Sequence, residues 1–202
     1  MSKNKRKVTS RKKISSARRA WIDEQDAFAG VDPFTGRWLN PPCSHWRDPV
    51  EITQATVVRA SAYCDRPPAG AWRWPDVGVY LCEAWAGAAG IASTSWAGPT
   101  VGSHAEIAIL AWRDGDAPAY PEQAERVLAY ALEAAQAGRD VEIGCLAGHG
   151  RTGTALAALM ILAGDGWRAS IDRVRLNYCV CAVETIEQER YLSGLAARLG
   201  RP

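Results

Sequence analysis

The sequence predicts an α/β fold in which helices flank a mixed or mainly parallel sheet. Segments rich in apolar and β-branched residues, typical of strands, occur at residues 55–60, 77–82 and 104–112. Residues 121–136 then form an amphipathic segment typical of a helix. A short strand, a glycine-rich turn and an apolar helix follow within residues 141–163. This alternation favours the α/β class, with a functional site at the carboxyl ends of the strands.

Composition limits the class of protein. A chain of 202 residues can bury one sizeable core, so we expect a single globular domain. With 48% hydrophobic and 23% charged residues, the chain has no apolar run near the roughly 18 residues that span a bilayer. Its basic start lacks the apolar core of a secretory signal. Six cysteines are compatible with a reducing cytosol, so a cytoplasmic location is expected.

The first quarter of the chain differs from the rest. Residues 1–20 contain nine Lys or Arg and no acid, a charge of +9 that leaves −7 on the remainder of a chain with net charge +2. We predict a disordered basic tail that binds nucleic acid or another anionic surface, or that only aids solubility. Residues 21–54 carry several proline turn signals and are predicted to form a loop-rich extension of the main domain, residues 55–202.

The most informative stretch runs from Val141 to Thr154 and reads V-E-I-G-C-L-A-G-H-G-R-T-G-T. Gly148, Gly150 and Gly153 would let the backbone curl with positive φ and approach a ligand closely. The N–H groups of this loop and the N-terminus of the following helix would then point into one concavity. Such a concavity is a site for an anion.

Three side chains in this loop give the anion site its chemistry. Cys145 would lie among N–H dipoles beside a helix N-terminus, surroundings that stabilise a reactive thiolate. Arg151 presents a planar fork matched to two phosphate oxygens. The hydroxyl of Thr152 lies within reach of Cys145 and could stabilise the thiolate as a leaving group. The residues predicted to hold the phosphate are Leu146, Ala147, Gly148, His149, Gly150 and Arg151.

The pattern Cys145-x5-Arg151-Thr152, with glycine at 148 and 150, resembles the C-x-x-G-x-G-R-[ST]-G signature of cysteine-dependent protein tyrosine and dual-specificity phosphatases. The resemblance covers about residues 55–199. It implies a dual-specificity-phosphatase-like fold and a phosphatase-like catalytic domain, with the nucleophile loop between a central strand and a buried helix. A glycine-rich turn around an inert cysteine is the alternative. The family usually has histidine where this chain has Gly144, so a shifted pH optimum is expected.

A candidate general acid lies in a second segment that is similar to the family. Residues 112–118, W-R-D-G-D-A-P, resemble the acid loop W-P-D-x-G-x-P, and Asp114 lies 31 residues before the cysteine, as the family's spacing requires. The resemblance implies that Asp114 protonates the leaving group, with Asp116 as the alternative. Trp74-Pro75-Asp76 also spells W-P-D, but it precedes a strand and lies 69 residues before Cys145, so we reject it.

The turn between two predicted C-terminal helices, residues 170–179 and 184–199, is similar to the family's Q-loop. Gln188 matches the second glutamine of that motif, which orients the hydrolytic water, and Glu184 takes the place of the first. The alternative is an ordinary capping box, because Thr185-x-x-Gln188 fits that pattern as well.

Three further residues near the loop have open roles. His149 could place a pH-dependent charge beside the substrate, or it could point to solvent. Either Cys179 or Cys181 could form a protecting disulfide with an oxidised Cys145.

The resemblance implies a phosphatase that hydrolyses phosphate monoesters through a phosphocysteine intermediate, with no metal or other cofactor. Phosphotyrosine, phosphoserine and phosphothreonine in proteins are the expected substrates. RNA 5′-triphosphates, which would suit the basic tail, and phosphoinositides are alternatives with the same chemistry. A catalytically weak, phosphate-binding pseudophosphatase is the alternative from another class. Cys43, His45 and Cys64 match no common zinc spacing, so no metal site is predicted.

Overall fold

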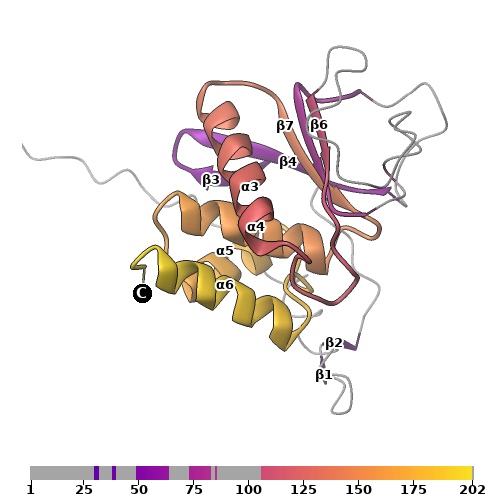
Figure 1. The fold of residues 1–202 in the computed structure, drawn as a ribbon, viewed down its shortest axis with the longest axis vertical. Helices are drawn as coiled ribbons and strands as arrows, with labels where there is room; N and C mark the ends of the chain where they lie inside the picture. The colour runs from indigo at the N-terminus through magenta and orange to yellow at the C-terminus, as the bar shows by residue number, and fades with distance from the viewer. Residues whose placement is uncertain are drawn as a thin grey trace, which may run out of the picture.

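The computed structural model describes residues 30–31, 38–39, 49–63, 73–82, 85 and 106–201 (Figure 1). The predicted basic tail, residues 1–20, lies outside the described residues, as does most of the predicted extension at 21–54. Cys43, His45 and Cys64 also lie outside them.

A five-stranded sheet forms the framework of the fold (Figure 1). Its strands are β3 (Val50–Thr53), β4 (Thr56–Ala62), β5 (Val77–Tyr80), β6 (Glu106–Ile109) and β7 (Val141–Cys145), in the order β3-β4-β7-β5-β6. β3 pairs antiparallel with β4, and the other three pairings are parallel. The predicted mixed, mainly parallel sheet is therefore confirmed, with β7 at its centre. A separate antiparallel pair joins β1 (Gly30–Val31) and β2 (Trp38–Leu39).

Two strands differ from the sequence prediction. Residues 50–53 belong to the sheet as β3, so the sheet begins before residue 55, where the main domain is predicted to start. Burial alternates along this short segment, with Val50 and Ile52 buried, as is typical of a strand. A tight turn joins the segment to β4. The sequence also suggests a buried strand at residues 104–112, whereas β6 is an edge strand in which only Ile107 is buried. An apolar run does not by itself distinguish these two positions.

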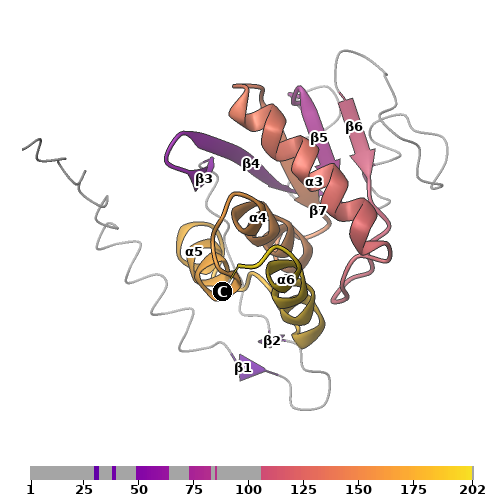
Figure 2. The ribbon, with the colours of Figure 1, turned by 60° about the vertical axis from the view of Figure 1, so that its left-hand side comes forward.

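Four helices lie on one side of the sheet (Figure 2). They are α3 (Pro121–Gln136), α4 (Gly150–Leu162), α5 (Trp167–Asn177) and α6 (Ile186–Arg198). α3 spans the predicted residues, with proline in its first turn and Gly138 at φ +81° just past its end. α4 is buried from Gly150 to Ile161 and contacts the other three helices or the sheet on every side. None of the described helices is long and apolar enough to cross a membrane.

The two faces of β7 serve different neighbours, because side chains alternate along a strand. Val141, Ile143 and Cys145 join the main core beneath the helices. Glu142 and Gly144 face the other side of the sheet, where Tyr80 and Trp85 lie in a second, aromatic cluster. The nucleophile candidate thus belongs to the helix side, and the residue before it belongs to the aromatic side.

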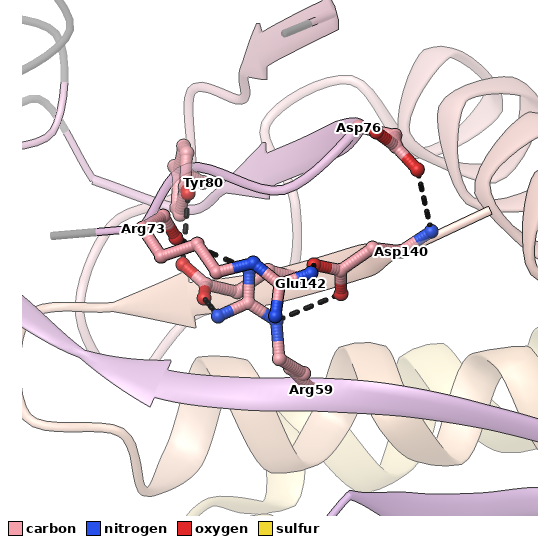
Figure 3. Close-up of polar contacts among 6 residues, drawn as sticks. All are labelled: Arg59, Arg73, Asp76, Tyr80, Asp140 and Glu142. Atoms are coloured by element: carbon pink, nitrogen blue, oxygen red, sulfur yellow. Dashed lines mark hydrogen bonds and ion pairs between the residues drawn. The ribbon is translucent and has the colours of Figure 1, made fainter.

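A polar network on that second face ties the sheet together (Figure 3). The buried carboxylate of Glu142 accepts a hydrogen bond from the Tyr80 hydroxyl at 2.8 Å and pairs with Arg59 Nη1 at 2.9 Å. Arg59 Nε donates to Asp140 at 2.8 Å, and the Asp140 N–H donates to Asp76 at 2.9 Å. Burial raises the pKa of Glu142, while Arg59 and then Tyr80 act in the opposite direction.

We predict that Glu142 makes the stability of the fold depend on pH. Because burial raises the folded-state pKa of Glu142 above the ordinary value of a glutamate, the favourable contribution is complete below that ordinary value and is lost as the pH rises through the folded pKa. The Glu142→Gln variant keeps an acceptor for Tyr80 and does not titrate. Urea denaturation across this pH range should therefore show the wild type losing free energy of unfolding relative to the variant. The exposed Glu133→Gln is the control, and parallel curves for all three proteins would contradict the prediction.

Candidate active site

The candidate nucleophile loop, residues 146–149, connects the central strand β7 to the buried helix α4. Gly148 takes φ +78°, a conformation that suits glycine, and its N–H donates to Cys145 Sγ at 3.1 Å. The Tyr178 hydroxyl donates to the Gly148 carbonyl at 2.6 Å and fixes the turn from outside. The sulfur therefore lies against a backbone donor at the carboxyl end of the parallel strands, as predicted for an anion site.

Gly150 and Gly153 are needed for a different reason from the one predicted. Both are helical residues of α4, and neither has a positive φ. A Cβ at Gly150 would collide with the Glu184 carboxylate and lie 3.0 Å from Gln188 Nε2. A Cβ at Gly153 would lie 2.9 Å from the Ala182 Cα. These glycines therefore allow the turn before α6 to pack closely against the first turn of α4.

Arg151 is buried and held in one orientation by backbone carbonyls. Its Nη1 donates to Leu81 O at 2.9 Å and to Trp112 O at 3.0 Å, while Nη2 pairs with Asp114 Oδ1 at 3.2 Å. Its Nε is buried and has no hydrogen-bond partner among the described residues. Nε and Nη2 form one edge of the guanidinium, which matches two oxygens of a ligand once Asp114 leaves Nη2.

The two candidate acids occupy different positions in the loop before α3. The carboxylate of Asp114 contacts Arg151, and 60% of this side chain is exposed. Asp116 instead pairs with Arg113 at 3.8 Å, and its carbonyl accepts a hydrogen bond from Trp112 Nε1 at 2.6 Å. Asp114 therefore lies beside the candidate phosphate site, and Asp116 does not contact Arg151.

The rejected triplet lies at the other end of the sheet. Asp76 precedes β5 and accepts the N–H of Asp140, the residue before β7. Cys145 is the last residue of β7. Asp76 and Cys145 therefore lie at opposite ends of the sheet, separated by the length of a strand.

The turn before α6 reaches the loop with both predicted side chains. Thr185 caps α6 by accepting the Gln188 N–H at 3.2 Å, which is one half of a capping box. The side chain of Gln188 still faces the loop: its Oε1 accepts the Glu184 N–H at 2.7 Å, and its buried Nε2 has no partner among the described residues. Thr185 Oγ1 also donates to Gly115 O at 2.6 Å, which joins this turn to the acid loop.

Thr152 lies at the start of α4 with its hydroxyl fully buried. This hydroxyl has no hydrogen-bond partner within the described part of the chain. A buried hydroxyl close to the loop and without a partner is available to a thiolate or an anion.

Several contacts around the loop were not predicted from the sequence. His149 is half-buried, and its Nδ1 lies 3.2 Å from the sulfur of the buried Cys179. Val183 has φ +59°, a strained value for a buried β-branched residue. Arg175 holds this turn by donating to the Ala182 carbonyl at 3.0 Å and to the Val183 carbonyl at 2.9 Å. No local pattern signals such contacts, since each joins segments that are separate in the sequence.

A family model described as "Polymorphic toxin system, DSP-PTPase phosphatase" matches residues 101–165, which contain both the acid loop and the nucleophile loop. The crystal structure of Tk-PTP in the active form is 25% identical and covers 76% of this chain and 99% of that chain, with a TM-score of 0.55. The resemblance to the cysteine-dependent dual-specificity phosphatases is confirmed. The predicted dual-specificity-phosphatase-like fold is confirmed with it.

Other proteins are also similar to this chain. A mutant form of Tk-PTP is 24% identical, with a TM-score of 0.56 over 77% of this chain and 98% of that chain. Kinase associated phosphatase, with its catalytic-site cysteine changed to serine, shares the fold at 14% identity, with a TM-score of 0.54 over 80% and 98% of the two chains. Two uncharacterized proteins of Methanocaldococcus jannaschii are 54% and 49% identical over 27% of this chain. These matches span 36% and 33% of those proteins, about a third of their length.

We predict that Gly153→Ala destabilises the protein although the position is helical. Alanine in place of glycine inside a helix normally adds about 1 kcal/mol of stability. At position 153 the new methyl group would overlap Ala182, and overpacking of this kind costs about 1–3 kcal/mol. Chemical denaturation should show a lower free energy of unfolding for Gly153→Ala. Gly194→Ala in α6 is the matched control, because its nearest neighbour is an arginine nitrogen at 3.4 Å. Equal stabilisation of both variants would refute the packing argument.

Proposed function

We propose that this chain is a cysteine-dependent phosphatase that hydrolyses phosphate monoesters through a phosphocysteine intermediate. The observation that carries the proposal is the buried guanidinium of Arg151, which is anchored through Nη1 and has no partner at Nε among the described residues. A buried cationic donor without a partner is costly, and a phosphate oxygen would satisfy it. Cys145 Sγ lies at the end of β7, where it accepts the Gly148 N–H of the adjacent loop.

In the first step, the thiolate of Cys145 attacks phosphorus and the bond from phosphorus to the leaving oxygen breaks. The phosphate dianion displaces the Asp114 carboxylate from Arg151 Nη2. The displaced carboxylate takes up a proton from solvent, and the resulting carboxylic acid gives that proton to the leaving oxygen. Loop N–H groups and Arg151 bind the oxygens that gain charge in the transition state.

In the second step, a water molecule attacks the phosphocysteine and the sulfur–phosphorus bond breaks. Asp114, now ionised, accepts the proton of that water, and Gln188 Nε2 orients it. The Thr152 hydroxyl donates a hydrogen bond to the departing thiolate of Cys145. Gln188 Nε2 and the Thr152 hydroxyl are buried and have no partners among the described residues, which supports these roles.

We propose phosphorylated tyrosine, serine and threonine in proteins as the substrates. Support comes from the exposure of the residues around the loop: Leu146 is 42% exposed and the side chain of Asp114 60% exposed. A phosphate carried by a short or a long side chain of a folded protein can approach such an opening. RNA 5′-triphosphates and phosphoinositides have the same reacting group and are separated from phosphoproteins by direct comparison of kcat/KM.

We predict that turnover of p-nitrophenyl phosphate, in reductant and EDTA, is lost in Cys145→Ser. Asp114→Asn should lower kcat by about 10²–10⁴ with a poor leaving group and by less with a good one, because only the poor leaving group needs a proton. Asp116→Asn is the matched control from the same loop and should change little. If the wild type shows no turnover but still binds vanadate, the proposal of an enzyme is wrong and the chain is a phosphate-binding module.

The description of the matching family favours a biological setting. We propose that the enzyme belongs to a polymorphic toxin system and acts in a reducing compartment, the cytoplasm, where a thiolate persists. Expression of the wild type should then slow the growth of a susceptible host cell, while Cys145→Ser at the same protein level should not. Equal growth of the two strains, with the phosphatase active in lysates, would argue against this setting.

A further inference from the structure

We propose that Trp85 is a positioning residue for the nucleophile: its indole N–H holds the carbonyl group of Cys145. Trp85 Nε1 donates to Cys145 O at 3.0 Å, and both residues are buried. The pairing of β5 with β7 ends at Tyr80 and Gly144, so this carbonyl lies just past the last paired residue of β5. The inference rests on the proposed function of Cys145 and names a residue outside the signature.

The indole occupies the space that a side chain at position 144 would need. A Cβ at Gly144 would collide with the hydroxyl of Ser61, and it would lie 3.2 Å from Ser61 O and 3.2 Å from Trp85 Cζ2. A side chain at this position would require Ser61 and the indole to shift. The glycine at position 144 and the indole of Trp85 therefore fit together, and the hydrogen-bond donor to Cys145 O comes from another segment of the chain.

A stack of aromatic rings fixes the indole. Tyr80 is stacked on Trp85 with ring centroids 4.1 Å apart and an interplanar angle of 12°. Tyr63 and Trp74 contact the same indole edge-on, at 5.4 and 6.4 Å. Tyr80 is itself held by its hydrogen bond to Glu142 in the polar network of the sheet (Figure 3). The donor thus has a defined direction.

The direction of this carbonyl determines the direction of the next backbone donor. A trans peptide group is planar, so the N–H of Leu146 points opposite to the carbonyl of Cys145. By holding the carbonyl on the aromatic side, the indole turns the N–H of Leu146 away from that side. This N–H is the first in the loop after the nucleophile. The indole N–H also offsets the negative end of the carbonyl dipole, and this favours an ionised sulfur nearby.

The test replaces Trp85 by phenylalanine, which keeps an aromatic ring and removes the donor. We expect kcat to fall about tenfold with KM little changed, the effect of losing one hydrogen bond that acts in the transition state. The pH at which iodoacetamide alkylates Cys145 at half its maximal rate should move upward. Trp167→Phe, at the start of α5, is the control and should leave both readouts at their wild-type values. An unchanged alkylation profile in a folded Trp85→Phe protein would overturn the inference.

A second measurement needs no variant of Trp85. In wild-type protein with ¹⁵N-labelled tryptophan, the indole N–H of Trp85 should exchange slowly with solvent and shift when vanadate binds, and the signal of Trp167 should do neither. Fast exchange and indifference to vanadate would overturn the inference. The alkylation profile does not depend on turnover, so failure of the proposed phosphatase activity and failure of this inference give different results.

Discussion

The hydrogen bonds between Arg151 and two backbone carbonyls hold the candidate site together. They join the start of α4 to Leu81 at the end of β5 and to Trp112 at the start of the acid loop. Because both acceptors are backbone carbonyls, these hydrogen bonds form only when the sheet and the loop of residues 112–118 are in their folded positions. The guanidinium is buried and is partly compensated by an exposed carboxylate. Under the proposed function, a bound phosphate would complete the balance of charge in the site.

The parts of the site that sequence could predict are those set by local geometry. Cys145 and Arg151 lie on either side of one short loop, at the end of β7 and in the first turn of α4, so the length of the loop fixes their relation. The amphipathic period of α3 likewise gave its bounds without knowledge of its neighbours. Asp114 was singled out by its distance along the chain, and its carboxylate contacts Arg151.

The parts that sequence could not predict depend on contacts between distant segments. Gly150 and Gly153 looked like residues chosen for positive φ, yet their role is to admit the turn around Ala182 and Glu184. The place of β6 at the sheet edge depends on strand order, which an apolar run does not encode. Trp85 lies in a segment rich in Ala, Gly and Ser with no motif of its own, and its partner is a backbone atom.

The two faces of β7 contact different neighbours, so a change at position 144 need not weaken the site that contains Cys145. Position 144 faces the aromatic cluster, so a side chain there would compete for space with Ser61 and Trp85. With a stacked tyrosine and indole on this face, a glycine at position 144 avoids that competition. The carbonyl of Cys145 accepts a hydrogen bond from the indole. If Trp85 acts as proposed, the nucleophile has a buried positioning donor that does not depend on a side chain at position 144.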